Sequence, residues 1–105
     1  MATIREVSEE ELQQVIKSGQ RVFVDFFSST CSPCKMLSFI LDDVAKSLED
    51  DIEILKVDMD KNATVMEKYA VSTFPAMVLF EDGEEKKRLK GLQQKPVIIE
   101  TIKSV

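Results

Sequence analysis

Apolar residues follow two different spacings along the chain, and the changes between them predict alternating strands and helices. Apolar residues run almost without a break through Val22–Phe27 and Ala76–Phe80, which predicts strands covered on both faces. Beyond residue 35 the apolar positions instead recur every three or four residues, the spacing of one face of a long helix. That face is predicted to hold Met36, Leu37, Ile40, Leu41, Val44 and Leu48.

Shorter patterns predict the other elements of the first two thirds of the chain. Thr3–Val7 is β-prone. Ser8 and Glu11 have the spacing of a reciprocal capping box, so a helix is predicted from about residue 9 to residue 17. Asp51–Val57 is predicted as a strand, and Asp60 as the cap of a helix that ends near residue 69.

The last third of the chain predicts a hairpin and a final helix. The turn Glu81–Gly83 joins two strands, and the second runs to about Lys90. Gly91 ends that strand, and Pro96 suits the first turn of a helix. Strands that alternate with helices pair in parallel through right-handed crossovers, and the hairpin adds an antiparallel pair. We therefore expect one α/β domain over residues 1–105, in the order β-α-β-α-β-α-β-β-α, with a central mixed sheet and helices on both faces.

Composition and charge narrow the class of protein. The 105 residues include 44% hydrophobic and 31% charged residues, as in ordinary globular domains. A net charge of -5 argues against nucleic acid as a partner, because phosphates require a concentrated basic surface. The sequence has neither a signal-like leader nor an apolar run of membrane-spanning length. We therefore expect a cytoplasmic protein that acts away from membranes.

The two cysteines carry the candidate chemistry. Cys31 and Cys34 lie just after a buried strand and at the start of a helix, where a pair separated by two residues is typical of a redox dithiol. One helical turn brings both side chains to the same side. The unpaired amides and the dipole at a helix start favour a thiolate, so Cys31 is predicted to be the nucleophile. Cys34 would resolve the mixed disulfide and close the Cys31–Cys34 disulfide, with no metal or bound cofactor.

Two other interpretations of the cysteine pair are possible. A purely structural disulfide would close a very small loop, which removes little entropy from the unfolded chain. A zinc site would need two more ligands, and because the chain contains no histidine, only carboxylates or a second chain could supply them. Both interpretations are therefore weaker than the redox pair.

The segments around these cysteines resemble the thioredoxin family. Val24–Lys35 is similar to the active-site segment of thioredoxins, and Val71–Pro75 to their second signature. Lys56–Asp58, Gly83 and Gly91 also fall where thioredoxins carry similar residues, so the resemblance covers the whole chain. It implies a thioredoxin fold in which the first cysteine is exposed and the second is more buried.

The resemblance also implies roles for residues outside the cysteine pair. Pro75 would be cis, and with Phe74 and Gly91 it would form the substrate-binding groove, where backbone pairing adds the substrate as a short strand. Asp25 is a polar residue inside an apolar strand, where burial raises a carboxyl pKa. The resemblance makes it the proton acceptor for the second cysteine, with Lys56 tuning it. The alternative is an Asp at the strand edge that reaches solvent.

Several positions depart from the family pattern. The active-site turn carries Thr30 and Ser32 beside Pro33, where thioredoxins usually place Trp before the first cysteine and Gly after it. The chain contains no Trp, so the flat apolar surface beside the nucleophile is smaller. Phe74 and Ala76 also differ from the usual residues around the cis-proline, which indicates a reshaped substrate groove.

The leading functional hypothesis is a monomeric protein-disulfide reductase active in electron transport and cell redox homeostasis. The resemblance implies that its electrons come from NADPH through a thioredoxin reductase, and that its substrates are disulfide-containing proteins. One alternative is a specialised disulfide oxidant or isomerase, in which a more stable thiolate makes the disulfide a stronger oxidant. The other is a docking module in which the fold binds proteins and the cysteines are incidental.

Overall fold

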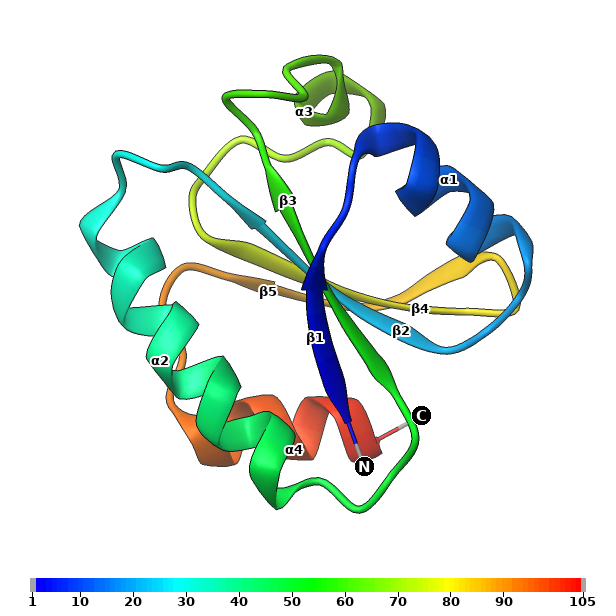
Figure 1. The fold of residues 1–105 in the computed structure, drawn as a ribbon, viewed down its shortest axis with the longest axis vertical. Coiled ribbons are helices and arrows are strands. Elements are labelled where there is room, and N and C mark those ends of the chain that lie inside the picture. Colours follow the sequence, from blue (N-terminus) through cyan, green and yellow to red (C-terminus); the bar gives the residue numbers. More distant parts are fainter. Residues whose placement is uncertain (1, 105) are drawn as a thin grey trace.

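A computed structural model describes residues 2–104 and contains the predicted order of elements. The strands are β1 (Thr3–Glu6), β2 (Val22–Phe27), β3 (Glu53–Asp58), β4 (Ala76–Glu81) and β5 (Glu84–Lys90). The helices are α1 (Glu9–Lys17), α2 (Ser32–Ser47), α3 (Thr64–Lys68) and α4 (Lys95–Lys103). Figure 1 shows α1 and α3 towards the top of the view, α2 running down the left and α4 lying across the bottom.

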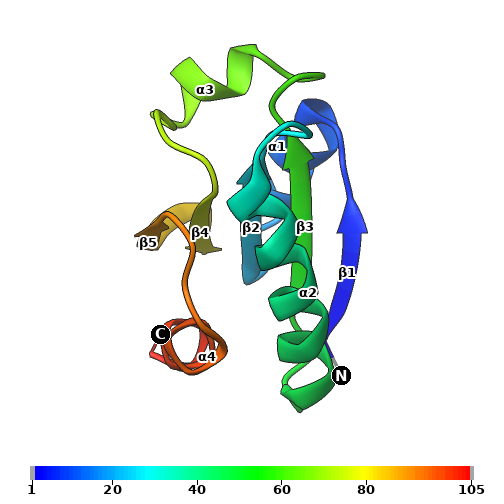
Figure 2. The ribbon, with the colours of Figure 1, turned by 90° about the vertical axis from the view of Figure 1, so that its left-hand side faces the viewer.

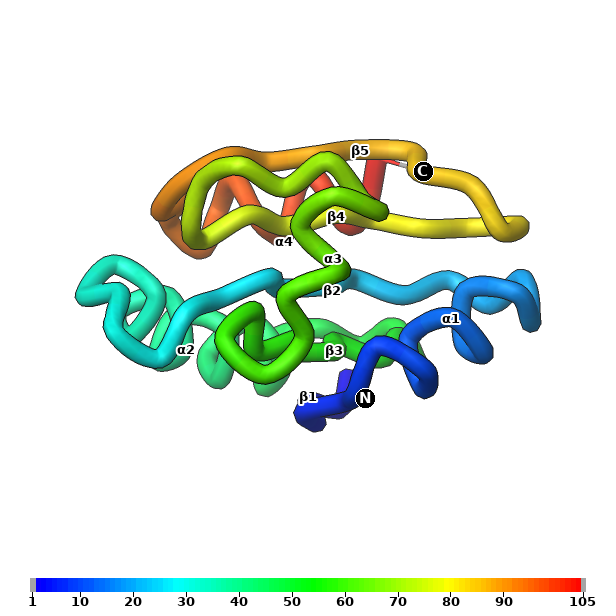
Figure 3. The backbone as a smooth tube through the Cα atoms, turned by 90° about the horizontal axis from the view of Figure 1, so that it is seen from above, coloured from blue at the N-terminus to red at the C-terminus, as the bar shows by residue number. Residues whose placement is uncertain are grey.

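The strands form one mixed sheet in the order β1-β3-β2-β4-β5. Figure 3 shows the strands following one another in this order from one side of the molecule to the other. β3 pairs in parallel with β1 and β2, whereas β4 pairs antiparallel with β2 and β5. The parallel pairs are joined through helices and the antiparallel edge through the hairpin, so the predicted mixed sheet is confirmed.

Helices cover both faces of this sheet. Leu12 of α1 and Val65 of α3 pack in one core cluster with the side chains of β2 that face them, such as Phe26. Leu37 of α2 and Ile98 of α4 pack in a second cluster on the opposite face. Figure 2 shows α2 in front of β2 and β3, with α4 below β4 and β5. The prediction of helices on both faces is therefore confirmed.

Strand β2 is buried on both faces, as its apolar run predicted. Successive side chains of a strand point to opposite faces, so Phe23 joins the cluster under α2 and α4 while Val24 and Phe26 join the other. Both phenylalanines are fully buried. The segment that follows the C-terminal end of β2 therefore starts from the middle of the sheet, at one end of its strands.

Local sequence signals explain where several elements start and turn. The Ser8 side chain accepts a hydrogen bond from the Glu11 amide, and the Glu11 carboxylate accepts one from the Ser8 amide, so the predicted capping box is present. In the β4–β5 turn both Asp82 and Gly83 have positive φ angles, 56° and 78°. Such a turn matches the twist of a tight hairpin.

The prediction that Asp60 caps the third helix is wrong. Helix α3 begins only at Thr64, and the residue in its cap position, Ala63, makes no side-chain cap bond. The Asp60 carboxylate instead accepts hydrogen bonds from Ser28 and Ser29, which lie more than thirty residues earlier in the chain. The Asp60 carboxylate therefore binds three hydrogen-bond donors from a distant part of the chain instead of the amides at the start of α3.

Two smaller predictions also differ from the structure. Met36 does not share the buried face of α2 and is 57% exposed, because Leu37, Leu41 and Val44 define that face and Met36 lies about 100° away from Leu37 around the helix. The third strand starts at Glu53 rather than at Asp51, after a short turn. Within residues 2–104, no helix is both long enough and apolar enough to span a membrane.

Candidate active site

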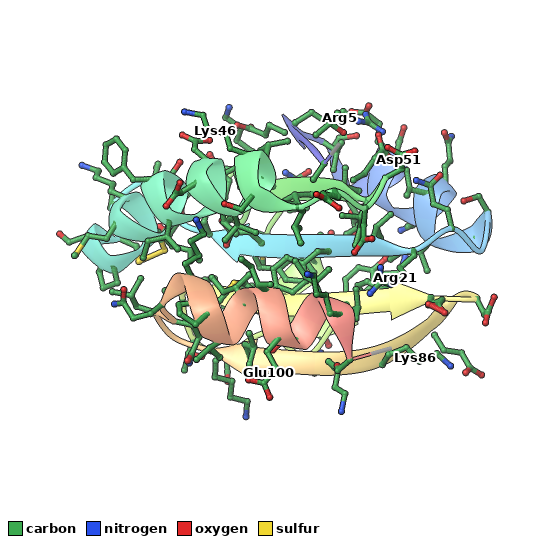
Figure 4. The ribbon with its side chains drawn as sticks, turned by 90° about the horizontal axis from the view of Figure 1, so that it is seen from below. Arg5, Arg21, Lys46, Asp51, Lys86 and Glu100 are labelled. Atoms are coloured by element: carbon green, nitrogen blue, oxygen red, sulfur yellow. A yellow bond between two sulfur atoms is a disulfide. The ribbon has the colours of Figure 1, made fainter. Side chains whose placement is uncertain are left out.

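The two cysteines lie at the junction between β2 and α2. The apolar run of β2 ends at Phe27, and three polar residues lead to Cys31, which occupies the N-cap of α2. Pro33 fits the first turn, where a missing amide proton removes no intrahelical bond. Cys34 lies one turn on and is joined to Cys31 in a disulfide, with a Cα–Cα distance of 5.2 Å. Figure 4 shows this disulfide near the start of α2.

The two sulfur atoms differ in access and in surroundings. Cys31 is partly exposed, whereas Cys34 is only 4% exposed. The Cys34 amide donates a hydrogen bond to the Cys31 sulfur at 3.2 Å. The same amide, together with the positive end of the helix dipole, would stabilise a Cys31 thiolate after reduction. Cys31 is thus the more exposed of the two cysteines, and its sulfur is the one that a backbone amide of α2 contacts.

Asp60 fixes the loop that carries Cys31. Its carboxylate oxygen Oδ2 accepts from the Ser28 hydroxyl at 3.1 Å, the Ser29 amide at 3.0 Å and the Ser29 hydroxyl at 2.7 Å. The hydrogen bonds from Ser29, followed by that from Ser28, hold the pKa of Asp60 below its usual value. The β3–α3 loop is thereby tied to the loop before the cysteines. Sequence reasoning missed this contact because its partners are distant in the chain.

Asp25 lies on the face of β2 that α2 covers, the face that also holds Phe23. It is fully buried, and neither carboxylate oxygen has a hydrogen-bond partner among the described residues. Burial raises the pKa of Asp25 to about 7, and the nearby Lys56 charge opposes part of that rise. Desolvation disfavours the carboxylate anion. Asp25 therefore does not reach solvent at a strand edge, and its carboxyl can gain or lose a proton near neutral pH.

Lys56 is the register partner of Asp25 on the neighbouring parallel strand, so the two side chains share a face of the sheet. The Lys56 ammonium donates a hydrogen bond to the Ser38 hydroxyl at 2.8 Å and lies 5.1 Å from the centre of the Phe27 ring. Ser38 was absent from the sequence-based candidates. Its position four residues after Cys34, on the same side of α2, is the signal that could have found it.

A cavity of about 230 Å³ lies next to Cys34. Its walls come from β2, the loop that follows, α2 and β3, and they include Phe27, Cys34, Ser38 and Lys56. The cavity is therefore lined both by the buried Cys34 and by Lys56 and Ser38, which are hydrogen-bonded to each other. Within residues 2–104, no group of three or more His, Cys, Asp or Glu side chains is arranged to hold a metal ion.

The Phe74–Pro75 segment lies at the same end of the sheet as the cysteines. Its peptide bond is cis. Pro75 directly precedes β4, whose first residue, Ala76, pairs with Phe26 near the end of β2. The Gly91 amide donates to the Pro75 carbonyl at 2.8 Å, and the Phe74 side chain packs against the core cluster under α1 and α3. The tertiary structure thus brings together the segments predicted to bind substrate and the segment that carries Cys31, the predicted nucleophile.

Comparison with known proteins agrees with this geometry. The model of the thioredoxin family, described as "Thioredoxin", matches residues 3–104. The chain belongs to the thioredoxin family. A thioredoxin from Rickettsia bellii is 40% identical over 90 residues, which cover 86% of each chain. A thioredoxin from Chlamydia trachomatis is 41% identical over 99 residues, or 94% of this chain and 95% of the relative.

Solved structures of thioredoxins have the same fold. A point-mutant thioredoxin from Halobacterium salinarum superposes with a TM-score of 0.85 at 31% identity, covering 96% of this chain and 88% of that one. Chloroplastic thioredoxin z gives a TM-score of 0.86 at 26% identity, covering 96% and 92% of the two chains. Family membership and the cysteine pair together make this protein a thiol-disulfide oxidoreductase with the thioredoxin fold.

Proposed function

We propose that this thioredoxin-family protein is a protein-disulfide reductase that works as a single monomeric domain. The observation that carries the proposal is the asymmetry of the disulfide: Cys31 is partly exposed at the start of α2, and Cys34 is buried one turn deeper. This arrangement gives an incoming disulfide access to one sulfur while the second is kept for intramolecular attack.

The first half of the reaction starts from the reduced pair. The Cys31 thiolate attacks one sulfur of the substrate disulfide, a new S–S bond joins Cys31 to the substrate, and the other substrate sulfur leaves as a thiolate that takes a proton from solvent. The cis Phe74–Pro75 segment and Gly91 lie at the end of the sheet where Cys31 emerges. Backbone pairing at Phe74 would orient the substrate as a short added strand.

The second half releases the reduced substrate. Cys34 loses its proton to the Asp25 carboxylate and attacks the Cys31 sulfur. The Cys31–Cys34 bond forms, the bond from Cys31 to the substrate breaks, and the second substrate sulfur leaves as a thiolate that takes up a proton. The substrate gains two electrons and the cysteine pair loses two. Asp25 suits this task because burial raises its pKa to about 7, where a base both accepts and returns a proton at neutral pH. Lys56 tunes Asp25 through its positive charge.

The oxidised protein must then be reduced again. We propose that a thioredoxin reductase supplies the electrons from NADPH and that no cofactor binds this chain itself. This assignment rests on family membership, as does the role in electron transport and cell redox homeostasis. The reducing cytoplasm is the compartment in which such a dithiol would be kept in its active state.

Thr30 and Ser32 flank the nucleophile where thioredoxins usually carry Trp and Gly. Thr30 lies in the loop held by Asp60, and its hydroxyl is 3.2 Å from that of Ser28. The small polar side chains leave less apolar surface for substrate beside Cys31. We therefore place substrate selection on the Phe74–Pro75 segment rather than on the residue before the nucleophile.

The test compares insulin-disulfide reduction by the wild type, Cys31→Ser and Cys34→Ser, with dithiothreitol as the electron source. We expect activity in the wild type and loss in both variants. When the pre-reduced proteins are mixed with insulin without dithiothreitol, only Cys34→Ser should accumulate a mixed disulfide, because its nucleophile is intact and its resolving thiol is absent. Ser47→Ala, on the exposed face of α2, is the control for folding. Activity retained by Cys31→Ser would overturn the proposal in favour of a docking module. A markedly oxidising reduction potential would indicate a specialised oxidant or isomerase.

A further inference from the structure

The Lys56 ammonium has a defined position inside the structure. Its Nζ donates to the Ser38 hydroxyl at 2.8 Å and lies 5.1 Å from the centre of the Phe27 ring. A hydroxyl acceptor on one side and an aromatic face on another both attract a cation. The two contacts come from α2 and β2, so the position depends on the packing of the helix against the sheet and not on β3 alone.

Asp25, in contrast, is left without a protein partner. Lys56 is its register neighbour on β3 and shares its face of the sheet, yet both Asp25 oxygens are buried and lack a hydrogen-bond partner among residues 2–104. A direct hydrogen bond between an ammonium and a buried carboxylate is among the stronger polar contacts in a protein. The Ser38 hydroxyl holds the ammonium at a position where that contact is not made.

The other groups on this side of the sheet do not replace Lys56. Helix α2 contributes the Cys34 sulfur and Lys35 to the cavity wall. Strand β4 and helix α4 face this side with uncharged residues, among them Met77, Ile98 and Ile102. Lys56 is the charge that acts on Asp25, and it lowers the pKa of Asp25 against the effect of burial. The position of the Lys56 ammonium therefore decides how strongly it lowers the pKa of Asp25.

We infer that Ser38 is a positioning residue for the resolving half-reaction: its hydroxyl holds the Lys56 ammonium away from Asp25 and so keeps the Asp25 carboxylate a competent base for the Cys34 thiol. The inference rests on the proposed function, because it concerns the same proton transfer. The proton moves from Cys34 sulfur to an Asp25 oxygen, and the thiolate left behind attacks Cys31. A carboxylate paired directly with an ammonium binds that proton more weakly.

Removal of the Ser38 hydroxyl is predicted to lower the titration midpoint of Asp25. In Ser38→Ala the ammonium loses its acceptor, and the unpartnered carboxylate of Asp25 lies on the same face of the sheet. Pairing of the two should lower the Asp25 titration midpoint by about one pH unit or more, the usual effect of a close cation on a carboxyl group. The release of substrate from the mixed disulfide should become slower, because the base is weaker.

The test measures the titration of the Asp25 carboxyl carbon by NMR in the oxidised protein, where the cysteines do not titrate. Ser38→Ala is compared with Ser38→Thr, which keeps a hydroxyl, and with Ser47→Ala, a matched serine on the exposed side of the same helix. We expect a lower midpoint in Ser38→Ala, and wild-type midpoints in the other two variants. An unchanged or raised midpoint in Ser38→Ala would overturn the inference.

A kinetic measurement on the same variants separates this inference from the proposed function. Single-turnover release of insulin from the mixed disulfide should be slowed several-fold in Ser38→Ala and restored in Ser38→Thr. If the proposed function fails, the wild type itself will not reduce insulin, whatever Asp25 does. If only the inference fails, the wild type will reduce insulin and Ser38→Ala will titrate and turn over as the wild type does.

Discussion

Replacement of Asp25 by asparagine tests the central electrostatic feature of the site through protein stability. The carboxyl is fully buried, and burial raises its pKa from 3.8 to about 7. Between about pH 4 and pH 7 the folded protein therefore holds a proton that the unfolded chain has already released. Since the folded state binds the proton more tightly, the free energy of unfolding must fall as pH rises through this window.

The size of this fall follows from the two pKa values. The difference between 3.8 and about 7, at about 1.4 kcal/mol for each pH unit, corresponds to ~4 kcal/mol. The fall is complete above the folded-state value and absent below the unfolded-state value. Asp25→Asn carries no titrating group at this position, so it should not show this part of the pH dependence.

The assay is urea unfolding of the oxidised proteins from pH 4 to pH 8.5, with the variant compared with the wild type at each pH. Other carboxyl groups titrate in both proteins, so their contributions cancel in the difference. We expect the stability of Asp25→Asn relative to the wild type to increase by ~4 kcal/mol across the range. Asp42→Asn, an exposed residue of α2, is the control and should show no such increase. A relative change below about 1 kcal/mol, the worth of one ordinary hydrogen bond, would refute the reasoning.

Three further predictions concern the neighbours of this group, the core and the active-site loop. Lys56→Met should move the Asp25 titration midpoint above about 7, because the opposing charge is removed; a lower midpoint by NMR would contradict this. Phe23→Ala should lower the free energy of unfolding, measured by urea denaturation, by about 3 to 5 kcal/mol, because removal of a fully buried ring leaves a cavity. A loss under about 1 kcal/mol would show that neighbouring side chains move in to fill that cavity. Asp60→Ala should speed hydrogen exchange of the Ser29 amide, which loses its acceptor, and exchange at the wild-type rate would show that the loop is held by other contacts.

Much of the fold could be predicted because its signals are local. The Ser8–Glu11 capping box acts over three residues, and the two positive φ angles of the hairpin turn need only Asp82 and Gly83. The uninterrupted apolar run of Val22–Phe27 requires cover on both faces wherever the strand is placed. For such features the sequence pattern and the structure agree, because each is decided by residues close together in the chain.

The local rule failed where a distant partner competed with it. Asp60 has the residue type of a helix cap, but Ser28 and Ser29 offer it three donors across the fold. Met36 fits a broad apolar stripe by spacing, yet the buried face of α2 is the one that holds Leu37 and Leu41, so Met36 is 57% exposed. Neither outcome could be predicted before the packing of α2 and of the β3–α3 loop was known.

The features of the site likewise fall into those decided locally and those decided by the tertiary structure. The sequence by itself determined that Cys31 and Cys34 share one turn at a helix start, since spacing and position decide that alone. Only the tertiary structure decided that Ala76, next to Pro75, pairs with Phe26 near the end of β2, and that Ser38, rather than Asp25, accepts the hydrogen bond of Lys56. The physical reason is that strand register and helix packing set these distances, and both depend on the whole core rather than on neighbours in the chain.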